Sequence, residues 1–385
     1  MRDCLLHLAD LHLGAAVTPR LQELDATAAA SLDRSRQQLL WRLADWVSLP
    51  ASRVGLVVIA GDLFHHHAPP QELADRTRQA LARMAAVVPV ITVPGNHDEY
   101  SYANCVYRQG SWPGRLVTET QPSVVWEGEL ESGCRVCVSG VAYEAGKLPP
   151  GGTPAFPQPD DGRLGIAVVH GTVRDHYREA VVEGERCFRV SHAQAAEAGY
   201  RYLALGHVHT SREWTIGPCT AVYPGPPVGP GPSDPGTGSV LMVVPGPGGV
   251  VLRRVDDAEL LGPRWHAEAV RPEPGEKPKD LADRLLPRLP ADPGRIVALT
   301  LRGSVDRENY AAELQQAFLE AGRAVLVEAE SLSIAAPPDV DALAQEQTLT
   351  GEFVRLWREW KQSDQPKEAH ALRVLHEGLA ALGRH

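Results

Sequence analysis

Hydrophobic runs alternate with helical patterns from the start of the chain to about Asp257. Five of these runs are apolar at nearly every position, which is typical of strands covered on both faces: 5–8, 54–59, 87–93, 166–169 and 202–205. Between them, apolar residues at helical spacing predict one helix near residues 27–48 and a second over 73–84, opened by Pro69-Pro70. The alternation predicts an α/β fold built around a sheet.

Shorter signals complete this part of the chain. Ser191 is a candidate N-cap for a short helix that ends at Gly199, and segments 124–130 and 135–141 predict a β-hairpin. Two stretches rich in proline and glycine, 146–162 and 224–238, predict loops. We expect the first near the rim of the sheet, and the second is a candidate border of the functional site.

A different pattern begins near Trp265. Strand signals at 265–270, 296–301 and 324–329 alternate with helical signals at 279–289 and 309–321, which predicts a small α+β unit.

The pattern becomes purely helical after Pro337-Pro338. One predicted helix carries an apolar stripe through Trp357 and Trp360, and a second carries a stripe through Leu372 and Leu379. We therefore expect three domains, over residues 1–264, 265–336 and 337–385.

Polar blocks follow the five hydrophobic runs. In open α/β sheets, ligands gather beyond the carboxyl ends of the strands, so this agreement in position is stronger evidence than any single block. The blocks are Asp10-Leu11-His12, Gly61-Asp62, Gly95-Asn96-His97-Asp98, His170-Gly171 and Gly206-His207-Val208-His209. They supply seven candidate metal ligands: Asp10, His12, Asp62, Asn96, His170, His207 and His209.

This donor set favours a pair of metal ions. Imidazole, carboxylate and amide ligands without thiolate suit manganese, iron or zinc better than copper or calcium. If Asp62 bridges, each ion receives four protein ligands and keeps room for water and substrate. Two such ions about 3.5–4 Å apart activate water and stabilise charge on phosphoryl oxygens, which is a means of hydrolysing phosphate esters.

Other residues of the blocks have different expected roles. His97 is better placed to protonate the leaving oxygen than to bind metal, a general-acid role that gives roughly 10²–10⁴-fold in rate. Four glycines are expected to let the backbone turn tightly beside the ligands: Gly61, Gly95, Gly171 and Gly206.

Two further features have competing explanations. His65-His66-His67 follows Asp62 closely, but the ligand set is complete without it, so we expect loop or packing residues, with His65 as a candidate wall of the cleft. Asp98 either orients a neighbouring histidine or makes a structural hydrogen bond in its loop.

Composition limits the partners. The 385 residues carry a net charge of −10, whereas phosphate contacts normally come from Lys and Arg. Nucleic-acid binding would therefore depend on bound metals, local basic patches or a partner protein, which counts against a free-standing, high-affinity DNA binder.

The N-terminus and the cysteines favour a cytoplasmic protein. The chain runs straight into the first polar block, and no apolar stretch approaches the roughly 18 residues of a spanning helix. Cys134 and Cys137 form a lone C-x-x-C inside an expected strand, where their side chains would point to opposite faces. We expect buried thiols in a reducing compartment, and no membrane association.

The blocks resemble those of the calcineurin-like metallophosphoesterases and, more narrowly, the SbcD-type DNA repair exonucleases, the nuclease half of bacterial SbcCD complexes. The segments that carry the resemblance are 7–14 (HLADLHLG), 60–64 (AGDLF), 93–98 (VPGNHD), 169–171 (VHG), 205–209 (LGHVH) and 221–225 (AVYPG). The resemblance implies an α/β fold with a two-sheet sandwich flanked by helices, a small α+β capping domain and a C-terminal helix pair. The proline-rich loop that begins at Pro224 departs from the family pattern.

The resemblance also implies roles for the ligands and partners. Asp10, His12, Asp62 and His209 would hold one manganese ion, and Asp62, Asn96, His170 and His207 the other. His97 would protonate the leaving group. The capping domain would contact DNA, the terminal helices would dock on an SbcC-like SMC-type ATPase, and a homodimer is a further expectation. Docking would explain an exposed stripe at Trp357 and Trp360; the alternative is that the stripe packs within the chain's own domain.

Three functions therefore compete. The leading one is a manganese-dependent exonuclease and endonuclease that hydrolyses phosphodiester bonds at DNA ends in DNA repair. The second is a metallophosphoesterase acting on a small nucleotide or another phosphodiester, which would not need the region beyond residue 265. The third is a non-catalytic scaffold for an ATPase partner, which the complete ligand set argues against.

Overall fold

The structure is a computed structural model that describes residues 1–145, 155–160, 162–173, 175–176, 188–292, 294–334, 339–366 and 368–382. The chain divides into two compact units, one of residues 1–22 and 26–265 and the other of residues 23–25 and 266–385. Most of the expected loop at 146–162, and the expected domain boundary at 336/337, lie outside the described residues. Among the described residues, no helix combines the length and apolar character that crossing a membrane requires.

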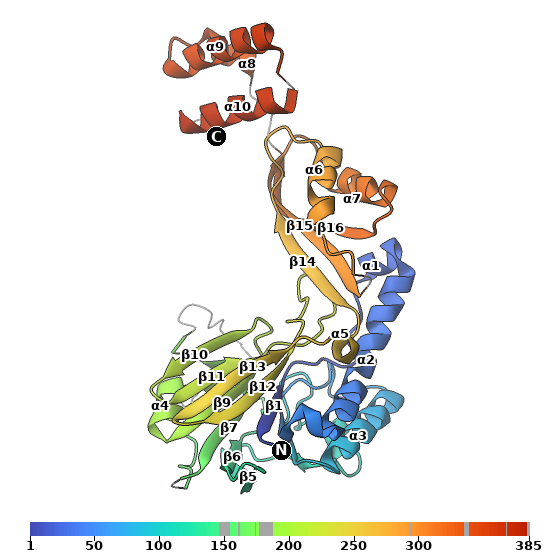
Figure 1. Ribbon diagram of the computed structural model, residues 1–385, viewed down its shortest axis with the longest axis vertical. Helices are drawn as coiled ribbons and strands as arrows, with labels where there is room; N and C mark the ends of the chain where they lie inside the picture. Colours follow the sequence, from blue (N-terminus) through green and yellow to red (C-terminus); the bar gives the residue numbers. More distant parts are fainter. Residues whose placement is uncertain are drawn as a thin grey trace. The chain divides into compact units, whose positions relative to one another are not determined.

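The first unit contains two sheets (Figure 1). In the order in which they pair, the strands of the six-stranded sheet are β13 (Gly249–Val255), β12 (Val240–Gly246), β1 (Cys4–Leu8), β2 (Val54–Ala60), β3 (Val90–Val93) and β4 (Arg115–Leu116). Those of the other sheet are β10 (Arg212–Ile216), β11 (Cys219–Tyr223), β9 (Tyr200–Gly206), β7 (Leu164–Val173), β6 (Arg135–Gly140) and β5 (Ser123–Glu129), with β8 (Phe188–Val190) paired to β7. The predicted hairpin is the antiparallel pair β5–β6.

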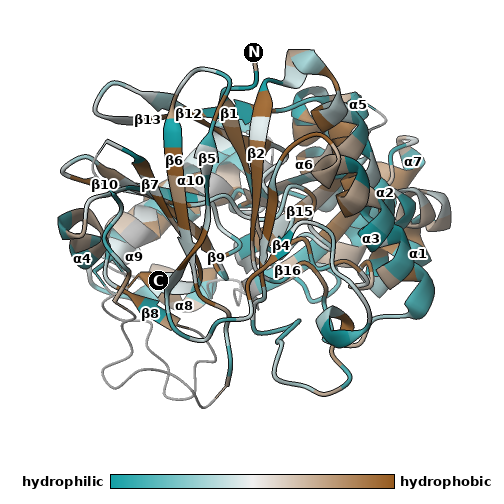
Figure 2. Cartoon of the chain, turned by 90° about the horizontal axis from the view of Figure 1, so that it is seen from below, coloured by the Kyte–Doolittle hydropathy of each residue, from teal (hydrophilic) through white to brown (hydrophobic). Residues whose placement is uncertain are grey.

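Apolar side chains from both sheets form one core between them. Leu56 and Val58 of β2 belong to the same buried cluster as Val138 of β6 and Ile166 and Val168 of β7. The central strands are accordingly hydrophobic along their length (Figure 2). This two-layer arrangement confirms the predicted α/β sandwich.

Helices cover the sheets on their outer faces. Helix α2 (Ala26–Ser48) joins β1 to β2 and α3 (Gln71–Ala85) joins β2 to β3, and Figure 1 shows the two helices side by side. Helix α3 buries Ala74, Thr77, Leu81 and Met84, the face that the apolar spacing predicts. Because β1, β2 and β3 pair in parallel, these crossovers bring the carboxyl ends of all three strands to one edge of the sheet.

The remaining helices of this unit are short. Ser191 caps α4 (His192–Glu197) by accepting a hydrogen bond from the Gln194 backbone N–H at 3.3 Å, as its sequence predicts. Helix α5 (Ala258–Leu261) is tied to α2 by the Arg42 side chain, which donates to the carbonyls of Leu260 and Leu261. Helix α1 (Pro19–Leu24) precedes α2.

The second unit follows the predicted order of elements. Its sheet is β14 (Arg264–Val270), β15 (Arg295–Val305) and β16 (Val325–Ile334), with α6 (Pro278–Leu285) and α7 (Tyr310–Glu320) packed through a shared core. The helical end of the chain comprises α8 (Val340–Gln345), α9 (Leu349–Asp364) and α10 (Glu368–Ala381), so a short third helix accompanies the predicted pair.

The tryptophan stripe is covered in the structure. Trp357 is only 7 % exposed, belongs to a core shared by α9 and α10, and donates from Nε1 to the Ala371 carbonyl at 2.7 Å. Trp360 packs against the same core. The alternative that the stripe packs within its own domain therefore holds for Trp357, where the expectation of exposure is wrong, whereas Trp360 is only partly buried. The large apolar side chains left exposed on α9 are Leu349 and Leu356.

Candidate metal centre

The seven candidate ligands come from five strands of the two sheets. Asp10 and His12 follow β1, Asp62 follows β2 and Asn96 follows β3, whereas His207 and His209 follow β9. His170 differs from the expectation, because β7 continues through it to Val173 and pairs there with β8. Its side chain projects from inside a strand, which fixes its position more firmly than a loop would.

Four of the candidate ligands have a left-handed backbone. The φ angles are +55° at Asp10, +43° at His12, +48° at Asp62 and +100° at His207. This region is uncommon for residues other than glycine, and its occupation at several functional positions is backbone strain that the surrounding structure must hold. The hydrogen bonds that hold it include those from the Asp10 backbone N–H to the Gly61 carbonyl at 3.1 Å and from His12 N–H to the Asp62 carbonyl at 3.0 Å.

The neighbouring glycines provide space more than turning freedom. Only Gly61 of the four predicted glycines has a positive φ, at +86°. At Gly206 a Cβ atom would lie 1.8 Å from the Ala60 carbonyl oxygen, and at Gly95 it would lie 2.2 Å from Asp62 Oδ1. The expectation of tight turns is thus wrong for Gly171 and Gly206, which lie within strands β7 and β9. At Gly95 and Gly206 the fold requires close approach of neighbouring backbone segments.

One half of the centre surrounds His12. Its Nε2 lies 3.0 Å from His209 Nε2 and 3.5 Å from Asp62 Oδ2. Ligand atoms of Asp10, His12 and His209 all lie within 4.8 Å of one another, a spacing at which three groups can hold one ion.

The other half surrounds His170. Its Nδ1–H donates to the Ala60 carbonyl at 3.0 Å, which turns Nε2 toward Asn96 Oδ1 at 2.9 Å and Asp62 Oδ2 at 3.3 Å. His207 completes this half, with its Nδ1 3.1 Å from Asn96 Oδ1. Asp62 Oδ2 faces both halves, which is the geometry that a bridging carboxylate needs.

Burial and mutual attraction set the charges of the cluster. Burial raises the pKa of Asp10 to about 6 and lowers that of His12 to about 3 and that of His207 to about 4. Burial acts on Asp62 and His170 too, but their attraction for each other outweighs it. The pKa of Asp62 falls below its usual range, and the pKa of His170 rises to about 9. Without a metal ion, the proton on His170 therefore offsets part of the negative charge of Asp10 and Asp62.

The residues present fit a cation. Asp10 Oδ2 is buried and has no hydrogen-bond partner among the residues that the structure describes. A buried carboxylate oxygen without a partner is costly, and a cation ligated there would remove that cost. A cation would also stabilise the facing Nε2 atoms of His12 and His209, which lie 3.0 Å apart. Two nitrogen lone pairs at that distance repel unless a proton or a cation lies between them.

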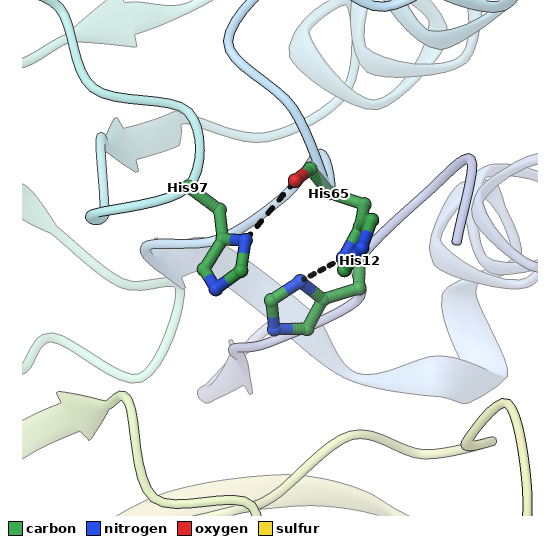
Figure 3. Close-up of side chains that lie close together, drawn as sticks. All are labelled: His12, His65 and His97. Atoms are coloured by element: carbon green, nitrogen blue, oxygen red, sulfur yellow. Dashed lines mark hydrogen bonds between the residues drawn. The ribbon is translucent and has the colours of Figure 1, made fainter.

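His97 lies beside the candidate ligand His12 (Figure 3). Its Nδ1–H donates to the His65 carbonyl at 3.0 Å, and its backbone N–H donates to Asp62 Oδ1 at 2.9 Å. The ring stands edge to face with His12, with 4.7 Å between centroids. Because Nδ1 is held by a carbonyl, Nε2 is the atom left to exchange a proton with a substrate.

The histidine run and Asp98 can now be assigned contacts. The His65 side chain lines the cavity beside the ligands and lies 3.3 Å from His12, nitrogen to nitrogen, whereas His67 stacks on Tyr102. The Asp98 carboxylate accepts from the Gly95 and Phe64 backbone N–H groups and from the Tyr107 hydroxyl. Asp98 therefore makes structural hydrogen bonds in its loop, the second of the two roles expected for it.

Sequence reasoning missed one residue of the site. Asp234, in the proline-rich loop, accepts a hydrogen bond from His209 Nδ1–H at 2.6 Å. It follows His209 by 25 positions and belongs to no recognisable block, so the only available signal was the expectation that its loop borders the site. Asp234 also lines a cavity of about 120 Å³ together with Asp10, His12, His97 and His209.

Comparison with known proteins assigns the family. A family model for the calcineurin-like phosphoesterases matches residues 5–211, so the chain belongs to that family of metal-dependent phosphoesterases, as predicted. No curated protein matches the chain.

Among solved structures, the phosphopantetheinyl hydrolase PptH from Mycobacterium tuberculosis is 14% identical over 59% of this chain and 91% of its own, with a TM-score of 0.33. Another crystal structure is 12% identical over 66% of this chain and 99% of its own, with a TM-score of 0.35.

Proposed function

We propose that this protein is a two-metal nuclease of the SbcD type, which hydrolyses phosphodiester bonds at DNA ends as an exonuclease and endonuclease in DNA repair. The observation that carries the proposal is the convergence of seven predicted ligands and His97 at the strand ends of a phosphoesterase fold. The finer assignment to DNA rests on the resemblance of the blocks to that subgroup and on the region beyond residue 265.

The proposed ligands divide between the halves of the centre. Asp10, His12 and His209 would hold one ion, Asn96, His170 and His207 the other, and Asp62 both. Manganese suits this mixture of imidazole, carboxylate and amide donors. When bound, two such cations activate water and stabilise charge on the phosphoryl oxygens.

His97 acts as the general acid in this proposal. The His65 carbonyl accepts the proton on Nδ1 and fixes the ring, so the protonated ring would deliver its second proton, the one on Nε2, to the departing 3′ or 5′ oxygen. The His12 ring limits how far the His97 ring can swing, because the two stand edge to face, and Asp62 fixes the His97 backbone by accepting a hydrogen bond from its N–H.

The size of the cavity favours a polymer over an enclosed small molecule. Sites that enclose a small ligand usually measure about 300–1,000 Å³. The cavity beside His12 and His209 measures about 120 Å³, enough for a phosphoryl group but not for a whole nucleotide. A long substrate would leave the rest of its chain outside the cavity.

The helical end of the chain is the proposed contact with a partner. We propose docking of the helical end of the chain on an SbcC-like ATPase. Because Trp357 is buried and Trp360 partly buried, the contact would use exposed side chains such as Leu349 and Leu356. A cytoplasmic location and a homodimer belong to the same proposal.

Cleavage assays test the function directly. Purified protein should degrade labelled linear DNA with manganese, more slowly with magnesium and not with chelator, and it should prefer DNA to bis(p-nitrophenyl) phosphate. His97→Ala should lose about 10²–10⁴-fold in kcat while keeping its bound metal, and His66→Ala in the adjacent loop should behave as wild type. Hydrolysis of the small ester without DNA cleavage would overturn the nuclease in favour of a small-molecule phosphodiesterase.

A further inference from the structure

The loop at 224–238 is rich in proline and glycine, yet internal hydrogen bonds tie it together. It joins β11 to β12, and its two arms are tied together by hydrogen bonds from Gly229 N–H to the Pro235 carbonyl at 3.1 Å and from Thr237 N–H to the Pro226 carbonyl at 2.8 Å. Five prolines within 224–232 restrict the backbone further.

The loop is also anchored to its surroundings from outside. The Val228 carbonyl accepts from Arg36 Nε at 3.3 Å, the Gly229 carbonyl accepts from Trp265 Nε1 at 3.2 Å, and the Pro230 carbonyl accepts from the Thr18 backbone N–H at 3.2 Å. The Arg36 guanidinium is buried and also donates to the carbonyls of Ala15 and His12. The same side chain thus fixes the loop and the backbone of a candidate ligand.

The tip of the loop places Asp234. Gly229 and Asp234 approach so closely that a Cβ atom at Gly229 would lie 1.8 Å from the Asp234 carbonyl oxygen. A further hydrogen bond, from Asp234 N–H to the Gly231 carbonyl at 3.1 Å, closes a turn around the acid. The backbone of Asp234 is therefore held on both sides.

We propose that Asp234 is a positioning residue that aims His209 at the metal centre, and that the proline-rich loop exists to hold this acid. The inference rests on the metal centre of the proposed function. A carboxylate oxygen only accepts hydrogen bonds, so the proton of neutral His209 lies on Nδ1 and the lone pair on Nε2 points toward His12 Nε2.

Loss of this positioning should have a measurable effect on metal affinity. Carboxylate partners of metal-binding histidines fix the tautomer and the ring orientation, and their loss costs about 10–100-fold in metal affinity or activity. His209 depends on such a partner more than the fully buried His170 does, because its side chain is 34% exposed.

Two measurements on the full chain test the proposal. Manganese affinity should fall about 10–100-fold in Asp234→Ala, fall less in Asp234→Asn, whose amide oxygen still accepts from Nδ1–H, and stay unchanged in Ser233→Ala, an exposed neighbour in the loop. In metal-free protein labelled with ¹⁵N-histidine, His209 should show the Nδ1–H tautomer in the wild type and lose it in Asp234→Ala.

Activity adds a third readout. Excess manganese should restore most of the kcat of Asp234→Ala, because the defect lies in holding the ion. Wild-type affinity together with an unchanged His209 spectrum in Asp234→Ala would overturn the inference. If affinity depends on Asp234 while the wild type cleaves no DNA, the nuclease proposal fails and the inference about Asp234 stands.

Discussion

Two histidines of the candidate centre are oriented by different kinds of hydrogen-bond acceptor. His170 projects from inside β7, is fully buried, and is oriented by a backbone carbonyl of β2. His209 follows β9, is one-third exposed, and is oriented by a side-chain carboxylate from a distant loop. The sheet itself therefore fixes the half of the centre around His170, which we call the inner half. The half around His12 and His209, the outer half, depends on a separate support.

Removing the group that joins the halves should have the largest effect. Asp62→Asn keeps a residue that tolerates a positive φ but removes the charge that faces both His12 and His170. We expect the affinity for both ions to fall by more than about 100-fold, which exceeds the loss expected on removal of a hydrogen-bond partner such as Asp234. Activity should also be lost. Isothermal titration with manganese measures this, and weakening of one ion only would show that the halves are independent.

Alanine substitution of His170 and of His209 should lower the free energy of unfolding by different amounts. In metal-free protein, His170→Ala leaves two buried carboxylates without their cationic partner and should cost about 3–5 kcal/mol. His209→Ala breaks a partly exposed pair with Asp234 and should cost less than about 1 kcal/mol. Urea unfolding compares the two, and equal losses would contradict the distinction.

The pH dependence of stability should show a smaller difference. The folded pKa of His170 is about 9, above the usual value of about 6.5 in an unfolded chain, so protonated His170 stabilises the fold fully below pH 6.5. This contribution is lost as the pH rises through about 9. The stability gap between metal-free wild type and His170→Ala should therefore narrow from pH 6.5 to 9.5, and a constant gap in urea unfolding would contradict the assignment.

The inner half could be predicted from the sequence, and the support of the outer half could not. Asp62, Asn96 and His207 each follow a hydrophobic run within a few residues. Parallel pairing of β2 and β3 brings Asp62 and Asn96 to one edge of their sheet, and His207 reaches them from the end of β9 in the other sheet. Asp234 reaches His209 only through the path of a folded loop, which no local pattern encodes.

The sequence also could not predict what covers the tryptophan stripe. Trp357 has the same spacing whether its stripe faces a partner or a neighbouring helix, and only the packing of α10 distinguishes the two. Similarly, the sequence places glycines beside the ligands but does not reveal that Asp10, His12, Asp62 and His207 themselves carry the positive φ angles.

Those four backbone conformations have a consequence for handling the protein. Those at Asp10 and His12 are held by main-chain hydrogen bonds, and that at His207 by a hydrogen bond from its N–H to the Asp10 carboxylate; none of these bonds needs an ion to form. The coordination cage is therefore built when the chain folds, unlike small zinc domains that collapse only around their metal. Stripping with a chelator should leave the architecture standing, ready to be reloaded with a different ion.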